Sequence, residues 1–222
     1  MKQSSYILLI LLFPLSSLFA QQTRLSFSTD VTVLRSLRKQ QHFWSLGQTV
    51  TGHFHFFPKD GAYVWLVYYN NGKFHNNLSA TAKQPLTTPQ DLPFKNNASM
   101  TFKQISLGWK HYLKGAFNTE NKWNLYATAG WGLMLGRITN THSVSIDTAD
   151  YYVQVLEGKA NFKRLTVDFS LGYEKPLGAD VFMYLEGRAL LPITDYPSNY
   201  IYIYNNAPLI ASVNLGFRIL FE

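Results

Sequence analysis

Alternation of apolar and polar residues with a period of two runs from Arg24 to the end of the chain and strongly limits how it can fold. This period places successive side chains on opposite faces of an extended strand. Eight segments carry the pattern, beginning at Leu25, Trp44, Ala62, Gln104, Asn124, Leu165, Val181 and Ser212. We find no helical period of useful length and no repeat at fixed spacing. The sequence therefore predicts an all-β chain of eight strands.

The connections between these segments alternate between short and long. The short ones are rich in Gly and Pro and typical of turns: Pro58–Gly61, Gly115–Lys122 and Lys175–Asp180. The long ones are Arg35–Gln41, Asn70–Ala98, Thr139–Phe162 and Pro192–Ala207. This order predicts an antiparallel, up-and-down arrangement with both chain ends on the side of the short turns. The third segment is apolar on both faces, so its facing stays open.

Alternation alone does not separate a soluble barrel from a membrane barrel. In lipid, strands can cross only as a closed barrel, because every backbone donor and acceptor must be paired. Membrane barrels combine short turns on one side with long loops on the other, as here. Aromatic residues on the apolar face form a predicted girdle beside the short turns: Phe54, Phe56, Trp123, Tyr173 and Phe221. Trp44 lies at the opposite level, and amphipathic rings favour both interfaces.

The charged residues of the strands lie on the polar face, which would then point inward. They are Asp30, Lys110, Asp168, Glu186, Arg188 and Arg218. An eight-stranded barrel is just wide enough for side chains to fill it, and buried ions must pair to offset their desolvation. The pattern predicts an eight-stranded antiparallel up-and-down transmembrane β-barrel with a filled polar lumen.

The N-terminus indicates export. Residues 1–20 contain Lys2, an apolar run over 6–15 and a small residue at Ala20, which together indicate a cleavable signal peptide. Residues 21–222 then form one barrel domain. The chain has no cysteine, which excludes a lipidated N-terminus, disulfides and thiolate metal sites. Its formal charge is +7, but the basic residues are scattered and the chain is exported, so we expect no nucleic-acid partner.

The C-terminus carries a more specific pattern. Asn214, Gly216, Ile219 and Phe221 match the polar-x-Gly-x-x-apolar-x-aromatic signal that closes bacterial outer-membrane barrels, although Glu222 follows the aromatic residue. With the signal peptide, strands and alternating loops, the chain resembles the small eight-stranded family that includes the membrane domain of outer-membrane protein A and its adhesion-linked relatives. The resemblance implies the bacterial outer membrane, contact with its lipid, and recognition of the last strand by the barrel-assembly machinery.

Candidate chemistry is sparse. His53 and His55 form an H-x-H pair that could bind a metal, but no third ligand is evident and structural lumen histidines are favoured. Outer-membrane enzymes that modify lipid A use a His, a Ser and an acid near the rim. A long connection here contains His142, Ser143 and Ser145, followed by Asp147 and Asp150. The deacylase pattern has His-x-Ser on a strand, whereas His142 and Ser143 are adjacent and in a predicted loop. The two aspartates could hold a divalent cation, but a solvated loop is favoured. We therefore predict no catalytic residue, no metal site and no cofactor.

Two further surface features stay open. Arg35, Arg38 and Lys39 cluster in the first long connection and could pair with lipopolysaccharide phosphates, or could be an ordinary solvated loop. Three alternating tyrosines precede the last strand and could stack on sugars or pair with another chain, or could pack on neighbouring loops: Tyr200, Tyr202 and Tyr204.

The predicted function is a porin-like outer-membrane barrel with a structural or surface-interaction role through long extracellular loops, binding a surface or envelope protein partner. The alternatives are a lipid A-modifying enzyme, a narrow pore, and a soluble lipocalin-like carrier with an apolar lumen.

Overall fold

The computed structural model describes residues 24–119, 122–178, 180–194, 199–201 and 208–221. The predicted signal peptide lies outside these residues. The regular secondary structure of the described residues consists of strands and one short 3-10 turn, η1 (Lys39–Gln41). The strands are β1 (Arg24–Ser36), β2 (Trp44–His55), β3 (Asp60–Ala82), β4 (Asp91–Lys114), β5 (Asn124–His142), β6 (Tyr151–Tyr152), β7 (Gly158–Gly178), β8 (Val181–Pro192) and β9 (Ile210–Phe221). Among the described residues, no helix is long and apolar enough to span a membrane.

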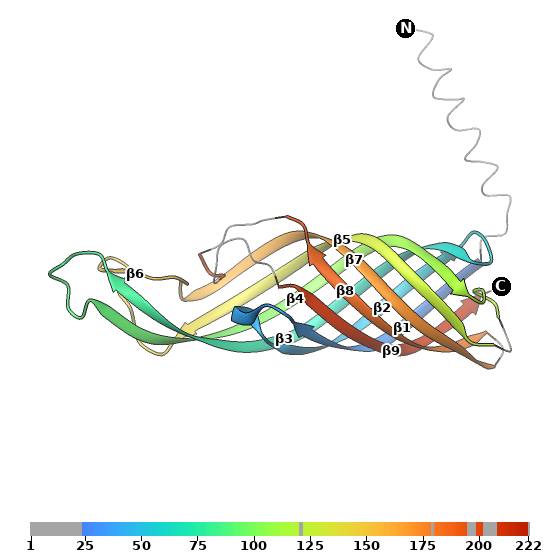
Figure 1. Cartoon of the computed structure of the whole chain (residues 1–222), viewed down its shortest axis with the longest axis horizontal. Helices are drawn as coiled ribbons and strands as arrows, with labels where there is room; N and C mark the ends of the chain where they lie inside the picture. Colours follow the sequence, from blue (N-terminus) through green and yellow to red (C-terminus); the bar gives the residue numbers. More distant parts are fainter. Residues whose placement is uncertain (1–23, 120–121, 179, 195–198, 202–207, 222) are drawn as a thin grey trace, which may run out of the picture.

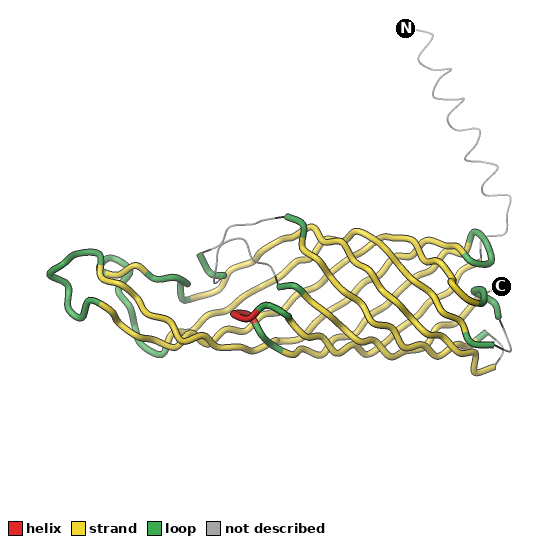
Figure 2. The backbone as a smooth tube through the Cα atoms, viewed as in Figure 1, coloured by secondary structure: helices red, strands yellow, loops and turns green. Residues whose placement is uncertain are grey.

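Eight of these strands close into a ring, as the alternation predicts (Figures 1 and 2). Each pairs antiparallel with its neighbours along the chain, and β9 returns to pair with β1 from Leu25/Phe221 to Ser36/Ile210. The two-residue strand β6 lies outside the ring and pairs with the end of β3 at Thr81 and Ala82. The apolar C-terminal segment is thus the last strand, and its pairing with the first removes both open edges from the barrel.

Large apolar side chains point outward along the barrel wall, as predicted for contact with lipid. Leu107 is 57% exposed and Trp131 is 72% exposed. The predicted girdle residues all face outward beside the short turns, and Trp44 faces outward at the other end. Two girdle residues, Trp123 and Tyr173, pack ring against ring, and a third, Phe221, packs on Phe27 of the neighbouring strand. The apolar belt places this barrel in a lipid bilayer.

The structure also settles the facing of the third strand. Tyr63, Trp65, Val67 and Tyr69 of β3 are buried in the lumen, whereas Leu66 and Tyr68 face outward. Apolar residues on both faces therefore serve two environments. The outward ones contact the membrane, and the inward ones fill the barrel.

Two predicted long loops contain much more strand than expected. The segment Asn70–Ala98 was expected to be a connection, but β3 and β4 stay paired as far as Thr81 and Asp91, interrupted by a bulge between Tyr69 and Gly72. Likewise Thr139–Phe162 contributes the ends of β5 and β7, paired to Asn140 and Gly158. Polar residues at inward positions, such as Asn76 and Asn96, interrupt the alternation and hide these strands from a pattern search.

The four longer strands β3, β4, β5 and β7 therefore continue past the rim where β1, β2, β8 and β9 stop (Figure 1). We call this part the extension: residues 70–98 and 137–162. Its inner face is covered by Phe74, Phe94, Ala98 and Ile138, which are buried.

Glycines on the inward face make room for large lumen rings. A Cβ placed on Gly136 would meet the ring of Phe162, and one on Gly172 would meet the ring of Tyr126. Each ring thus lies against the bare backbone of a neighbouring strand. This pairing of inward glycines with inward aromatic residues allows a narrow barrel to hold many rings.

Candidate functional site

The half of the lumen beside the short turns contains an ionic network with two centres. The first, Glu174 on β7, accepts two hydrogen bonds from Arg218 on β9, at 2.8 Å from Nε and 2.6 Å from Nη2. Lys110 Nζ lies 3.7 Å from the same carboxylate, and Asn124 Nδ2 donates to it at 3.1 Å. This bidentate pairing of a guanidinium with a carboxylate is the strong form of charge-assisted hydrogen bonding.

The second centre is Arg188 on β8, which bridges two carboxylates. It donates to Asp168 at 2.6 Å and to Glu186 at 2.9 Å. Tyr63 donates to Asp168 at 2.5 Å, and Asn214 Nδ2 donates to Glu186 at 3.1 Å. Residues from four strands therefore meet around one guanidinium, and each carboxylate has a neutral donor in addition to a cation.

Burial requires this matching. The fully or nearly buried charges of the described residues are four carboxylates and four cations: Asp30, Asp168, Glu174 and Glu186, and Lys110, Arg164, Arg188 and Arg218. The cavity among the network's side chains has a volume of only ≈ 10 Å³. That is about the minimum for a single water, so side chains fill the lumen at the level of the network.

The predicted histidine pair belongs to this lumen. His53 and His55 stack at 6.1 Å between ring centroids, and each ring nitrogen Nε2 lies within hydrogen-bond distance of a serine hydroxyl, Ser28 at 3.2 Å and Ser26 at 2.8 Å. His55 also stacks on Phe117 at 4.5 Å. No group of three or more potential metal ligands occurs among the residues that the structure describes. The pair packs and hydrogen-bonds as a structural element.

The other half of the lumen corrects the expectation of a wholly polar interior. Above the ionic network many of the large inward side chains are apolar and tightly buried: Leu34, Phe43, Val67, Tyr69, Met100, Phe102, Met134, Ile138, Phe162, Leu190 and Ile210. Gln104 and Arg164, which stand opposite Met134 on the neighbouring strands, are buried among them. They form one cluster that extends into the extension through Phe74 and Ala98. We call the two halves the ionic layer and the aromatic layer. The sequence pattern missed the second because inward apolar residues here sit beside outward ones, which erases the alternation.

The candidate enzyme residues His142 and Ser143 are not hydrogen-bonded to each other, and each makes other contacts. His142 is the last residue of β5, where a loop was expected, and its ring packs on Phe94 at 4.6 Å. Burial lowers its pKa, and its Nε2 has no hydrogen-bond partner among the described residues. The hydroxyl of Ser143 accepts a hydrogen bond from the backbone N–H of Lys95 at 2.9 Å. A histidine activates a serine only when the hydroxyl lies within hydrogen-bond reach, and His142 Nε2 contacts no hydroxyl among the described residues.

Asp147 and Asp150 take part in the hydrogen bonds of a turn. Asp147 Oδ1 accepts the backbone N–H of Ala149 at 2.7 Å, and the backbone oxygen of Asp147 accepts the N–H groups of Asp150 and Tyr151. This is the ordinary role of an aspartate that hydrogen-bonds its own backbone in a turn. The two residues therefore organise the loop that carries β6.

The remaining predicted surface features are only partly described. Arg35 lies near the end of β1 and over the ring of Trp44 at 5.0 Å, while Arg38 and Lys39 belong to the following turn. Tyr202 and Tyr204 lie outside the described residues, so the tyrosine ladder is untested. Tyr200 is half-buried, and its carbonyl accepts a hydrogen bond from Asn140.

Sequence reasoning underrated the lumen tyrosines and Glu174. Tyr126 donates to Glu186 at 3.1 Å and Tyr184 donates to Asp30 at 2.5 Å. The alternation places Tyr126 and Tyr184 on the inward face of their strands, but the sequence does not show which carboxylate each tyrosine contacts.

Comparisons with known proteins agree with this geometry. No family model matches the chain, and no curated protein matches its sequence. Among 22 matching solved chains is Neisserial surface protein A, 10% identical, with a TM-score of 0.54 over 89% of this chain and 97% of that one. Two others have a TM-score of 0.49 and 9% identity. The attachment invasion locus protein of Yersinia pestis matches 90% of this chain and 99% of its own, and a major outer membrane protein of Thermus thermophilus matches 89% and 99%.

At such identities the likeness shows the fold alone. The closed ring, the outward apolar belt and the filled lumen define the class: a small eight-stranded transmembrane β-barrel. Its architecture is that of bacterial outer-membrane barrels of the type seen in outer-membrane protein A, and the bacterial outer membrane is its location.

Proposed function

We propose that the chain is a non-enzymatic surface-interaction protein whose barrel serves as an anchor and whose extension makes the contact. The observation that carries this proposal is the length difference between strands. Four strands pass the rim by many residues, and the other four stop at it (Figure 2). A protein needed only to span the membrane has no use for an ordered sheet outside it.

The extension offers an unpaired strand edge. The partner strand β2 meets β3 only up to Tyr69, so from Gly72 to Ala80 one edge of β3 has no strand beside it among the described residues. An exposed edge of this length is a ready template for another chain. Two large apolar side chains are exposed near its tip, Leu86 at 91% and Tyr152 at 66%. A surface or envelope protein that adds a strand to this edge is the partner we infer.

The test uses a photo-crosslinking residue at position 86 on intact cells, with the same residue at Leu37 as control. Leu37 is also exposed and apolar, at 52%, but it follows the short strand β1. We expect a discrete adduct from position 86 and none from position 37. Changing Leu86 and Tyr152 to Ser should weaken cell attachment or aggregation, whereas changing Leu37 and Ile193 to Ser should not. Equal behaviour of the two pairs would contradict the proposal.

Two steps of biogenesis remain part of the proposal. Cleavage after the predicted signal should leave a mature chain beginning at or near Gln21, which N-terminal sequencing checks. The last strand, with Asn214, Gly216 and Phe221, would be the element read by the barrel-assembly machinery. Replacing Phe221 by Ser should then lower the amount of folded barrel in cells more than its refolding yield in detergent.

A further inference from the structure

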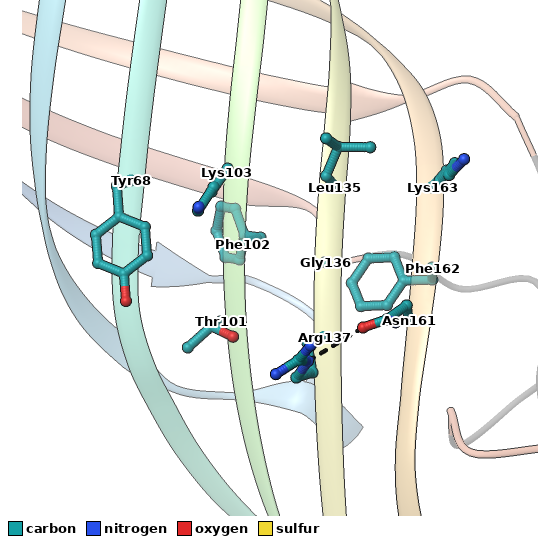
Figure 3. A pocket seen from close by; sticks show the side chains of 10 residues that line it. All are labelled: Tyr68, Thr101, Phe102, Lys103, Leu135, Gly136, Arg137, Asn161, Phe162 and Lys163. Atoms are coloured by element: carbon teal, nitrogen blue, oxygen red, sulfur yellow. Dashed lines mark hydrogen bonds between the residues drawn. The ribbon is translucent and has the colours of Figure 1, made fainter.

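A hollow on the outside of the barrel wall is bordered by three cations (Figure 3). It has a volume of ≈ 500 Å³ and lies on β3, β4, β5 and β7, at the upper limit of the apolar belt. Its outward side chains include Tyr68, Lys103, Leu135, Arg137, Asn161 and Lys163. Because these strands are all paired here, the floor is a rigid sheet.

The strand register places two of the three cations in one row and the third beside it. Lys103 and Lys163 stand in one row with Tyr68 and Leu135 across the four strands. Arg137 stands one outward position further from the membrane centre. Strands in a sheet are spaced by about 4.8 Å, so Lys103 and Lys163, two strands apart, are rooted roughly 10 Å from each other.

The three cations lack acidic partners. None forms an ion pair within the described part of the chain, and the acids on the outward faces of these four strands, Asp60 and Asp91, lie near strand ends. Arg137 is oriented by a hydrogen bond from Nε to Asn161 Oδ1 at 3.1 Å, which Figure 3 marks. This bond engages Nε and leaves the two terminal nitrogens of the guanidinium to bind an anion.

Below the cations the wall becomes apolar. The next outward row toward the membrane centre is Leu66, Ile105, Leu133 and Leu165. A second hollow of ≈ 870 Å³ continues from the first, sharing Tyr68, Lys103 and Leu135 and reaching Val50, Leu66 and Ile105. The pair of hollows is therefore amphipathic, with cations above and hydrocarbon-compatible walls below.

We propose that this surface binds a phosphorylated glycolipid of the outer leaflet of the lipid A type. Its headgroup phosphates contact Lys103, Arg137 and Lys163, and an acyl chain lies along Leu66 and Ile105. The charge complementarity selects an anionic headgroup. The spacing of Lys103 from Lys163 favours a headgroup with more than one phosphate over a glycerolipid with one. The position on the side of the long connections selects the outer leaflet.

The site differs from the predicted basic cluster of Arg35, Arg38 and Lys39, which sits on and beyond the end of β1. It also does not depend on the extension having a protein partner. A sequence search could not find it, because its three cations come from three strands and look like isolated outward residues.

The experiment measures binding of bisphosphorylated lipid A to the purified full barrel in nanodiscs of neutral lipid, by native mass spectrometry. The test variant is K103Q/R137Q/K163Q. The matched control is K59Q/K122Q/K175Q, which removes the same number of cations beside the short turns. Heat-modifiable migration and circular dichroism verify that both variants are folded barrels.

We expect the test variant to bind lipid A at least about tenfold more weakly, because it loses several charge-assisted hydrogen bonds, and the control to stay within about twofold. Dephosphorylated lipid A should bind weakly, and its affinity should be the same for the wild type and the test variant. Equal loss in both variants, undiminished binding of the dephosphorylated lipid, or equal competition by phosphatidylglycerol or inorganic phosphate would each overturn the proposal.

Discussion

The two halves of the lumen solve the same problem differently. The ionic layer excludes water with matched charges centred on Glu174 and Arg188, whereas the aromatic layer excludes it with rings and aliphatic side chains such as Phe102 and Leu190. Both are buried within the same strands. The difference lies in what each tolerates: the ionic layer depends on every partner being present, and the aromatic layer depends on volume.

The location of each layer follows from its neighbours. The aromatic layer is continuous with the apolar inner face of the extension through Phe74 and Ala98, so one core supports barrel and extension together. The ionic layer is bounded below by a small cluster that closes the barrel beside the short turns: Tyr112, Phe117, Tyr126, Phe182 and Leu220. The ionic layer therefore lies between two apolar clusters, and the larger of these also forms the core of the extension.

Removing one partner from the ionic layer should have the largest effect. Glu174→Leu leaves Arg218 and Lys110 buried without their carboxylate, so we expect a loss of about 3–5 kcal/mol in the free energy of unfolding. Urea titration of the barrel in short-chain lipid vesicles, followed by tryptophan fluorescence, measures it. The triple variant K110M/E174L/R218M should recover at least half of the loss. If it recovers none, the loss of stability does not come from leaving Arg218 and Lys110 buried without their carboxylate.

A cavity in the aromatic layer should cost somewhat less. Leu190→Ala removes a fully buried side chain, and we expect a loss of about 3 kcal/mol in the same titration. Leu190→Met conserves volume and should stay within about 1.5 kcal/mol of the wild type. A larger loss for Met than for Ala would show that this layer depends on specific contacts, as the ionic layer does.

A charge on the apolar belt tests the boundary that both layers share. Leu107→Arg places a cation in hydrocarbon near the middle of the belt on β4, so we expect a loss of about 2–3 kcal/mol. The control is Leu86→Arg, a change at the exposed tip of the extension that should fall within about 0.5 kcal/mol. Equal small effects at both positions would place residue 107 in water and contradict the membrane orientation.

The smallest predicted effect concerns one neutral hydrogen bond at the closure of the barrel. Thr32 on β1 donates to Asn214 Oδ1 on β9 at 2.6 Å, inside the lumen. Thr32→Val should cost about 1 kcal/mol, because the Asn214 oxygen then lacks this donor. Thr101→Val, at an outward position, is the control and should cost less than about 0.5 kcal/mol. A result at position 32 as large as that of Glu174→Leu would mean that closure, not charge pairing, limits stability.

Much of the fold could be predicted from local pattern. The strands, their antiparallel order, the outward belt and the inward positions of Asp168, Glu186 and Arg188 all follow from a period of two. The prediction was wrong where that period is broken or masked. Asn76 and Asn97 looked like loop residues although they pair with β4 and β3. The aromatic layer was missed because β3 is apolar on both faces.

For most strands the sequence by itself determined which side chains share a face, since the geometry of an extended strand depends only on adjacent residues, but the facing of β3 came from the structure. It also determined that the apolar C-terminal segment had to be a barrel strand. Only the tertiary structure decided that Arg218 meets Glu174, that Lys103 and Lys163 share a row, and that four strands outlast the others. These outcomes depend on the register between strands far apart in the chain, and closure of the ring sets that register for all eight strands together.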